Sequence, residues 1–218
     1  MKQFTTFPVF HGITDKTDGL FINRDERQEW FAQRYPGTPY FEVHQKHTAT
    51  VLVIDGKVQP SEAYNTTADA IVSKQKNIIM AVKTADCVPV LLYDPAAQVG
   101  AVIHSGWKGI LANIVQKTIQ VMKQQGASAH HIQALLGPAI NVCCYTVSAE
   151  RIAAFREAGL PVHDNALCLA ESVAMQLKEE GVDRIITPVT CTSCQSEQYF
   201  SFRREGPDHG TMISFVCL

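Results

Sequence analysis

The apolar residues of the chain fall mostly into short runs with the length of a β-strand, separated by turn-forming residues. Six such runs in the first half predict strands at 40–45, 50–54, 70–73, 78–83, 88–93 and 99–104. Further runs predict strands at 184–189, 198–202 and 212–217, and "IQALLGPAI" predicts a strand that ends in a Gly-Pro turn. The chain is therefore rich in strands along its whole length.

Helical spacing replaces these runs in four places. Residues 23–35 predict a helix that Asn23 caps and Pro36-Gly37 stops, and residues 109–125 predict a longer one that ends at Gly126. A short helix is expected over 148–158, capped by Ser148, and another over 166–180, ended by Gly181. Because helices and strands are interspersed and at least one hairpin is antiparallel, the pattern favours an α+β or mixed-sheet α/β fold over a doubly wound parallel sheet.

One stretch, "TADCVPVLLYDPAAQVGAVIHSGWKG" at 84–109, predicts a hairpin with a thiol and an imidazole at its open end. With residues 94–97 as a four-residue loop, Tyr93 faces Gln98 and the ladder places Cys87 opposite His104. Directly opposed residues have Cβ atoms about 4.5–5.5 Å apart on one face of the sheet. That separation suits a thiolate–imidazolium pair, two ligands of one metal, or a buried structural cysteine beside a histidine.

The surroundings of this pair favour a functional site. His104 leads into "SGWKG", where a glycine turn and the start of a helix would direct positive charge toward the thiol and toward an anionic ligand. Upstream, "HQKHTATV" offers His44 and His47 as a third ligand. Two histidines and one cysteine would leave a fourth tetrahedral position open, as in catalytic zinc sites. The spacing does not decide whether His44, His47 or neither joins the pair.

Composition narrows the classes of function. The chain has 218 residues, a net charge of -2, a pI of about 6.4 and 46% hydrophobic residues, which is unlike proteins that bind nucleic acid or membrane surfaces. No signal peptide or membrane span is recognisable, so we expect a cytoplasmic protein with reduced thiols.

Cysteines outside the hairpin are expected to be mostly structural. Cys143, Cys144, Cys168 and Cys217 are interpreted as buried, unpaired residues. "CTSC" at Cys191–Cys194 is a C-x-x-C, but no second such pair completes a zinc knuckle, and the βαβ setting of a redox motif is missing. "SFRREG" places Arg203 and Arg204 beside a strand end, either to clamp phosphate or carboxylate or to form a solvated rim.

Taken together, these motifs resemble one family closely. "ADAIVS", "TADCVPVLLYDP", "GAVIHSGWKG", "ALLGPAI", "CCYTV", "CTSC" and "FSFRREG" occur in the order found in the YfiH/YlmD-like family. Its members were first called laccase-domain or multicopper polyphenol oxidases and later described as zinc-dependent purine nucleoside enzymes. The resemblance covers nearly the whole chain, so it implies a single YfiH-like domain over 1–218. It also implies an α/β/β/α layered fold related to the cytotoxic necrotizing factor type.

The resemblance also assigns the metal ligands. The family's two histidines and one cysteine match His47 in "QKH", Cys87 in "TADC" and His104 in "HSGWKG". One departure lies near the N-terminus, where the family shows a pattern like H-G-F-x-T-R-x-G-G and this chain has "HGITDKTDG". Lys16 stands in place of the arginine, and a lysine would hold phosphate without a bidentate fork.

The leading functional hypothesis is therefore a zinc enzyme with nucleoside and phosphate as small-molecule partners. The resemblance implies phosphorolysis of adenosine, inosine, guanosine or methylthioadenosine, and deamination of adenosine. The candidates for phosphate charge are Lys16, Lys108, Arg203 and Arg204, and Asp86 is the nearest candidate acid or base beside Cys87 and His104.

Three alternatives remain open. A metal-free hydrolase or deamidase acting on a cell-wall peptide or an amide would use Cys87 as nucleophile and His104 as base. Copper-dependent phenol oxidation is disfavoured, because multicopper oxidases use H-x-H pairs and this sequence has none. A binding module without catalysis would require the Cys/His set to be inert.

Overall fold

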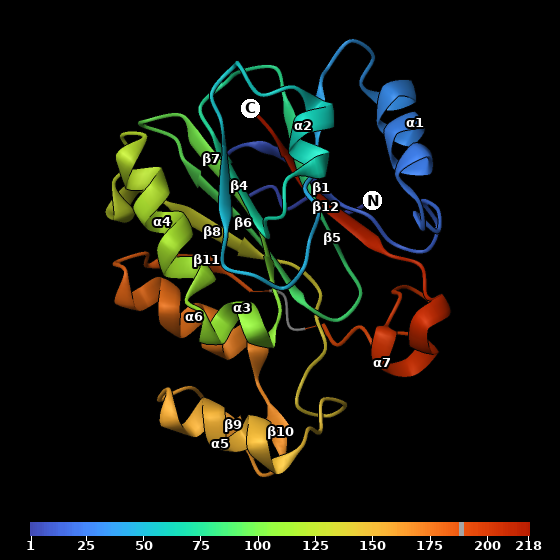
Figure 1. Ribbon diagram of the computed structural model, residues 1–218, viewed down its shortest axis with the longest axis vertical. Coiled ribbons are helices and arrows are strands. Elements are labelled where there is room, and N and C mark those ends of the chain that lie inside the picture. Colours follow the sequence, from blue (N-terminus) through green and yellow to red (C-terminus); the bar gives the residue numbers. More distant parts are fainter. Residues whose placement is uncertain (188–189) are drawn as a thin grey trace.

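Two mixed β-sheets lie face to face at the centre of the computed structural model, which describes residues 1–187 and 190–218 (Figure 1). The larger sheet has the strand order β11 (Arg184–Ile186), β8 (Gln133–Leu136), β6 (Val88–Asp94), β7 (Val99–Ser105), β4 (Ala70–Ser73) and β3 (Val51–Ile54). The smaller has the order β1 (Phe10–Ile13), β12 (Met212–Cys217), β5 (Ile79–Thr84) and β2 (Tyr40–Phe41). Parallel pairs (β3–β4, β8–β11 and β2–β5) occur beside antiparallel ones, so both sheets are mixed.

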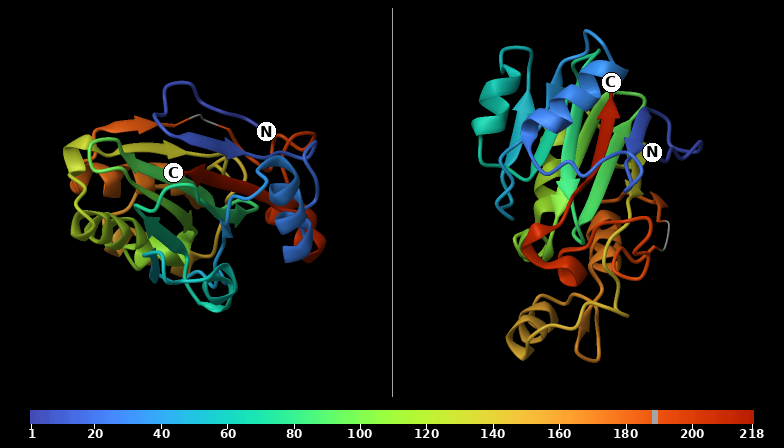
Figure 2. Two further views of the ribbon diagram at one scale, coloured as in Figure 1. Left: turned by 90° about the horizontal axis from the view of Figure 1, so that it is seen from above. Right: turned by 90° about the vertical axis from the view of Figure 1, so that its right-hand side faces the viewer.

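Helices cover the outer face of each sheet (Figure 2). On the larger sheet lie α3 (Trp107–Leu111), α4 (Ile114–Gln124) and α6 (Leu169–Glu179), and on the smaller sheet lies α1 (Arg24–Arg34). The helix α2 (Pro60–Asn65) follows β3, and α5 (Ala149–Glu157) projects at one end of the molecule with the hairpin of β9 (Val162–His163) and β10 (Ala166–Leu167). The mixed α/β fold class is thus confirmed, with the predicted order of layers.

Successive side chains of a strand point to opposite faces of its sheet, and this explains why the larger sheet packs against helices on one face and against the second sheet on the other. Along β6, Val90 and Leu92 pack under the helices, whereas Leu91 points to the second sheet and packs with Met80 and Val216. All five side chains are buried. Since both faces of β6 are covered, residues 88–92 are all apolar instead of alternating with polar residues.

Several predicted boundaries are wrong. The helix expected over 109–125 is two helices, because Asn113 adopts a left-handed conformation (φ 60°) between α3 and α4. The strand expected over 198–202 is absent from this described segment, and Phe202 begins the short helix α7 (Phe202–Glu205), which continues into a 3-10 turn, Gly206–Asp208. Residues 166–167 belong to β10 and not to α6. The predicted strand 184–189 is observed up to Ile186, and its residues 188–189 lie outside the described part.

The hairpin register differs from the predicted one by two residues. Asp94 pairs with Val99, so the loop is 95–98, and His104 faces Pro89. The carboxylate of Asp94 accepts hydrogen bonds from the backbone N–H groups of Ala96 (2.8 Å) and Ala97 (3.1 Å), which closes the turn after Asp94. The direct Cys87–His104 pairing is therefore wrong, but a shift of two residues keeps both side chains on one face.

Two further findings concern the cysteines and the membrane. All seven cysteines are described and free of disulfides, including the four that were interpreted as unpaired. The predicted burial is wrong, because Cys143 is exposed and Cys144, Cys168 and Cys217 are only partly buried. Within residues 1–187 and 190–218, no helix combines the length and the apolar character needed to cross a membrane.

Candidate active site

Three side chains from separate segments meet at the open end of the β6–β7 hairpin. His104 lies near the end of β7, Cys87 directly precedes β6, and His47 lies in the loop between β2 and β3. One potential ligand atom from each lies within 4.8 Å of the other two, and Cys87 Sγ is 3.9 Å from His47 Nε2. The two imidazole rings stand 4.8 Å apart, centroid to centroid. The cluster includes His47 and not His44, as the family resemblance implies.

A buried carboxylate that the sequence reasoning missed orients this cluster. Asp69 Oδ1 accepts a 2.8 Å hydrogen bond from His104 Nδ1 and a 3.0 Å hydrogen bond from the His47 backbone N–H. Its Oδ2 accepts from the backbone N–H of Thr48 (2.6 Å) and from the Thr48 hydroxyl (2.8 Å). Burial opposes ionisation of Asp69, but the hydrogen bonds from His104 and Thr48 outweigh it and lower its pKa to about 2.

The position of Asp69 follows from strand pairing. In the antiparallel β4–β7 pair Ala70 faces Ile103, so Asp69, one residue earlier, faces His104. A 2.7 Å bond from the His104 backbone N–H to the Asp69 carbonyl continues the ladder. The motif "ADAIVS" contained this aspartate, but its role depends on a pairing of strands about 30 residues apart that the sequence did not reveal.

The donor set fits a metal such as zinc. Because Nδ1 of His104 bonds to Asp69, its Nε2 is the nitrogen available as a ligand, in the carboxylate–histidine arrangement typical of metal sites. Gly106 leaves room for this geometry. A Cβ atom at that position would lie 2.8 Å from Cys87 Sγ and 2.9 Å from His47 Cδ2, so any side chain there would displace two of the three residues.

Without a metal, the site favours a charged pair. Burial raises the pKa of Cys87, but the positive charge of His104 and hydrogen bonds from both histidines lower it to about 6. Burial lowers the pKa of His104, whereas the Cys87 thiolate and Asp69 raise it to about 9. The helix expected after the glycine turn is α3, which has five residues and begins directly after Gly106.

His47, Cys87 and His104 line part of a cavity of about 590 Å³. Its walls include three aromatic side chains, Trp107, Tyr145 and Phe202, and three cationic ones, Lys83, Arg151 and Arg203. Arg151 lies over the Trp107 ring at 4.5 Å and Arg203 over the Tyr145 ring at 5.1 Å. The volume is within the range of small-molecule sites. Of these six residues only Arg203 was proposed from the sequence, because the six come from segments that are far apart in the chain.

The four cations predicted for phosphate separate into two groups. Arg203 lines the cavity, and its guanidinium donates to the Thr146 carbonyl (2.8 Å). The other three are not among the lining residues: Lys16 pairs with Glu205 at 3.0 Å, and Lys108 lies beside the Trp107 ring. The guanidinium of Arg204 donates to the backbone carbonyls of Thr192, Ser193 and Tyr199 and to the Glu205 carboxylate, so its hydrogen-bonding capacity is largely used.

Asp86 lines the cavity, and each of its carboxylate oxygens accepts a hydrogen bond from another segment. Its Oδ1 accepts a 2.6 Å hydrogen bond from the Thr192 hydroxyl, and its Oδ2 accepts a 2.7 Å hydrogen bond from the Arg203 backbone N–H. Its own φ is 97°, a conformation in which these bonds hold the residue directly before Cys87. The carboxylate thus fixes the turn that carries the thiol and the start of α7.

Comparison with known proteins places the chain in a family. The family model for multi-copper polyphenol oxidoreductase laccase matches residues 4–218. The chain belongs to this family. It is 36% identical over 196 residues (87% of the chain, 79% of the relative) to a purine nucleoside phosphorylase of Clostridium acetobutylicum. It is 31% identical over 189 residues (79% and 72%) to adenosine deaminase RL5 of an unknown prokaryotic organism.

The solved structures agree with this placement. The crystal structure of Bacillus licheniformis hypothetical protein YfiH superimposes with a TM-score of 0.81 at 27% identity, over 89% of this chain and 80% of that one. This agreement extends the match from sequence motifs to the arrangement of the two sheets and their helices.

Proposed function

We propose that the protein is a zinc-dependent purine nucleoside enzyme that phosphorolyses adenosine, inosine, guanosine or methylthioadenosine and deaminates adenosine. The names of the relatives support this class of substrate. The observation that carries the proposal is the His47–Cys87–His104 cluster at the wall of a cavity lined by aromatic and cationic side chains. Such a cavity offers faces for a purine ring and charge for phosphate.

His47 Nε2, Cys87 Sγ and His104 Nε2 would hold the zinc ion, with a fourth position open toward the cavity. When bound, zinc supplies Lewis-acid polarisation to a group placed at that position. One thiolate and two imidazoles suit zinc. A multicopper centre needs more imidazoles than the described clusters contain, since the remaining ones comprise four cysteines, or one histidine with a cysteine and a glutamate.

The chain's own residues would orient the substrate. Tyr145 and Trp107 line the cavity and would stack on a purine, and Arg203 and Arg151, each held over one of those rings, would supply positive charge for phosphate. Lys83 adds a third cation, and burial, with a contribution from Arg27, lowers its pKa. Asp86 would position Cys87 and Arg203. Its role as acid or base stays a prediction, since each oxygen accepts one hydrogen bond and retains a further lone pair.

A second candidate rests on the charged pair. A thiolate at Cys87 beside an imidazolium at His104 is the arrangement of a metal-free cysteine hydrolase or deamidase, which could act on a peptide or an amide. In that enzyme His47 would be dispensable for the nucleophile–base pair.

Replacing His47 by Ala separates the two candidates, with His44→Ala as the matched control three residues away on the same loop. We expect His47→Ala to lose zinc and at least about 100-fold in nucleoside turnover, since a catalytic zinc needs three protein ligands. His44→Ala should keep both. Zinc would be measured by elemental analysis, and base release and deamination by chromatography on the four nucleosides, with and without phosphate.

The opposite result would be equally clear. Full activity of zinc-free wild-type protein, or of His47→Ala, together with a covalent adduct at Cys87 from a thiol-reactive amide analogue, would replace the zinc proposal by the cysteine hydrolase.

A further inference from the structure

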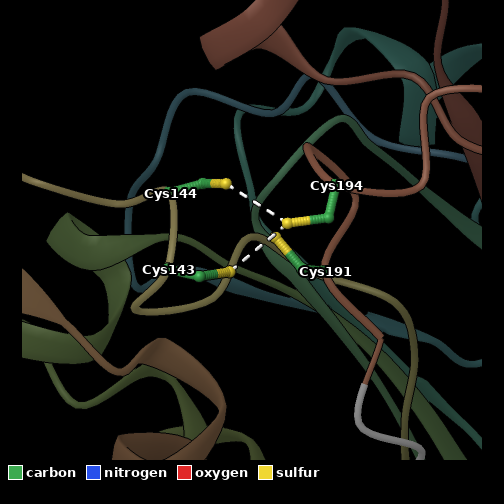
Figure 3. Close-up of side chains that lie close together, drawn as sticks. All are labelled: Cys143, Cys144, Cys191 and Cys194. Atoms are coloured by element: carbon green, nitrogen blue, oxygen red, sulfur yellow. Dashed lines mark hydrogen bonds between the residues drawn. The ribbon is translucent and has the colours of Figure 1, made fainter.

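A second group of potential metal ligands lies outside the nucleoside cavity and consists only of cysteines. Cys143 and Cys144 come from the turn after β8, and Cys191 and Cys194 come from the turn that precedes α7 (Figure 3). The Sγ atoms of all four lie within 4.8 Å of one another. Cys194 Sγ is 3.5 Å from Cys143 Sγ and 3.4 Å from Cys144 Sγ.

These separations match a metal site better than a disulfide. Sulfur atoms in a disulfide are about 2.05 Å apart. Four sulfurs placed tetrahedrally at about 2.3 Å from a zinc ion are roughly 3.8 Å apart, which is close to the observed spacing. Figure 3 shows the four side chains pointing toward a common centre from two sides.

The backbone around the cluster is built to hold both turns. The N–H groups of Cys144 (2.9 Å) and Tyr145 (3.0 Å) donate to the Asn141 carbonyl, and the N–H of Asn141 donates to Cys191 Sγ at 3.4 Å. A parallel bridge joins Ala139 to Cys191. An N–H group directed at a sulfur stabilises a thiolate, so Cys191 is already placed as a ligand.

Positive charge is also present at the turn that carries Cys191 and Cys194. The guanidinium of Arg204 donates to the carbonyls of Thr192 and Ser193, the two residues between Cys191 and Cys194. Four thiols that bind one Zn²⁺ release four protons and form a tetrathiolate complex with two net negative charges. A cation fixed against the turn offsets part of that charge.

We propose that Cys143, Cys144, Cys191 and Cys194 bind one thiophilic divalent cation, with Zn²⁺ the expected ion, as a structural site separate from the His47–Cys87–His104 centre. Four thiolates close the coordination sphere, so this site leaves no position for substrate. It departs from a zinc knuckle, because one half is an adjacent Cys-Cys pair and not a second C-x-x-C, which explains why the sequence did not indicate it.

The site would brace one wall of the nucleoside cavity. Thr192, inside the C-x-x-C turn, donates to Asp86 beside Cys87. Tyr145 follows Cys144 directly and lines the cavity, and the carbonyl of Thr146 accepts from Arg203. A metal that joins the two cysteine turns therefore fixes the segments that carry Tyr145, Arg203 and Asp86.

Metal content tests the proposal on the full chain, purified under reducing conditions and supplied with zinc alone. We expect two zinc ions per wild-type chain, one in His47→Ala and one in Cys194→Ser, with Cys217→Ser as the control that retains both. With Co²⁺ in place of zinc, strong thiolate-to-cobalt absorption should persist in His47→Ala and largely disappear in Cys194→Ser.

Three results would overturn the proposal: one zinc ion per wild-type chain that vanishes in His47→Ala, a cobalt spectrum unchanged by Cys194→Ser, or disulfides among the four cysteines in the mass spectrum of the freshly purified protein. If Cys194→Ser fails to fold, the exposed Cys143 provides a second variant, Cys143→Ser, and the wild-type stoichiometry needs no variant.

Discussion

Asp69 makes five hydrogen bonds through its side chain, four to the loop 46–48 and one to His104. A single carboxylate thereby fixes both the loop that carries His47 and the orientation of the His104 ring. The aspartate also determines which nitrogen of His104 faces Cys87. At the scale of single residues, the geometry of the candidate metal centre depends on a residue that would itself contact no metal.

We expect Asp69→Asn to lower zinc affinity about 10- to 100-fold, the usual cost of losing a carboxylate behind a metal-bound histidine. Competition with a chelator would measure it. Asp94→Asn is a matched control, because Asp94 is also fully buried and also accepts backbone N–H groups, but at the far end of the hairpin. Equal zinc affinities in the two variants would show that Asp69 does not support the metal centre.

At the scale of single elements, the sequence predicted the bounds of several strands but not the register of the hairpin or the break in a helix. The segments β4, β6 and β7 were predicted within about one residue, because their apolar runs are bounded by turn residues. The register of the β6–β7 hairpin was not, because the two loops, 94–97 and 95–98, differ by a shift of two residues that keeps every side chain on the same face, so alternation cannot distinguish them. The side chain of Asp94 decides between them. Asn113 likewise breaks a helix that helical spacing alone predicted as continuous.

The strand β1, which the sequence did not predict, contains a histidine that should make stability depend on pH. His11 is buried, its Nε2 accepts from the Phe4 backbone N–H (3.0 Å), and its Nδ1 donates to the Val9 carbonyl (2.8 Å). Burial lowers its pKa below the ordinary value of 6.5, against a smaller opposite effect of Val9. Protonation is therefore easier in the unfolded chain, and the stabilisation present above pH 6.5 is lost as the pH falls through the lowered value.

Urea unfolding of wild type and His11→Gln at a series of pH values from 8 to 5 checks this expectation. The wild type should lose more free energy of unfolding than the variant across this range, because glutamine does not titrate. Parallel curves for the two proteins would show that His11 does not contribute to the acid sensitivity.

At the scale of the whole molecule, the two sheets share an apolar interface to which strands of both contribute. Leu91, at the centre of the larger sheet, is fully buried there together with Val102, Met80 and Val216. The fold class and the layers were predictable because apolar runs and the family motifs extend over nearly the whole chain. The walls of the cavity were not, because Lys83, Tyr145 and Arg151 converge only through the packing of the sheets and loops.

Leu91→Ala should lower the free energy of unfolding by about 2–5 kcal/mol, since the two sheets cannot close completely on the cavity left behind. Leu52→Ala is the control, because Leu52 contacts the same interface from the edge strand β3 and is only partly buried. Chemical denaturation measures both. Equal losses would mean that the centre of the interface contributes no more to stability than its edge, and zinc affinity should be unchanged in either folded variant.

Gly106 carries a consequence for the descent of this protein. Every other amino acid brings a Cβ atom that would approach the side chains of Cys87 and His47 closer than van der Waals contact, so any substitution at this position must shift one or both of them. We therefore expect replacement of this glycine to disturb the arrangement of Cys87 and His47. Among relatives of this chain, the glycine of "HSGWKG" is thus expected to be kept wherever the His-Cys-His arrangement of the candidate metal centre is kept.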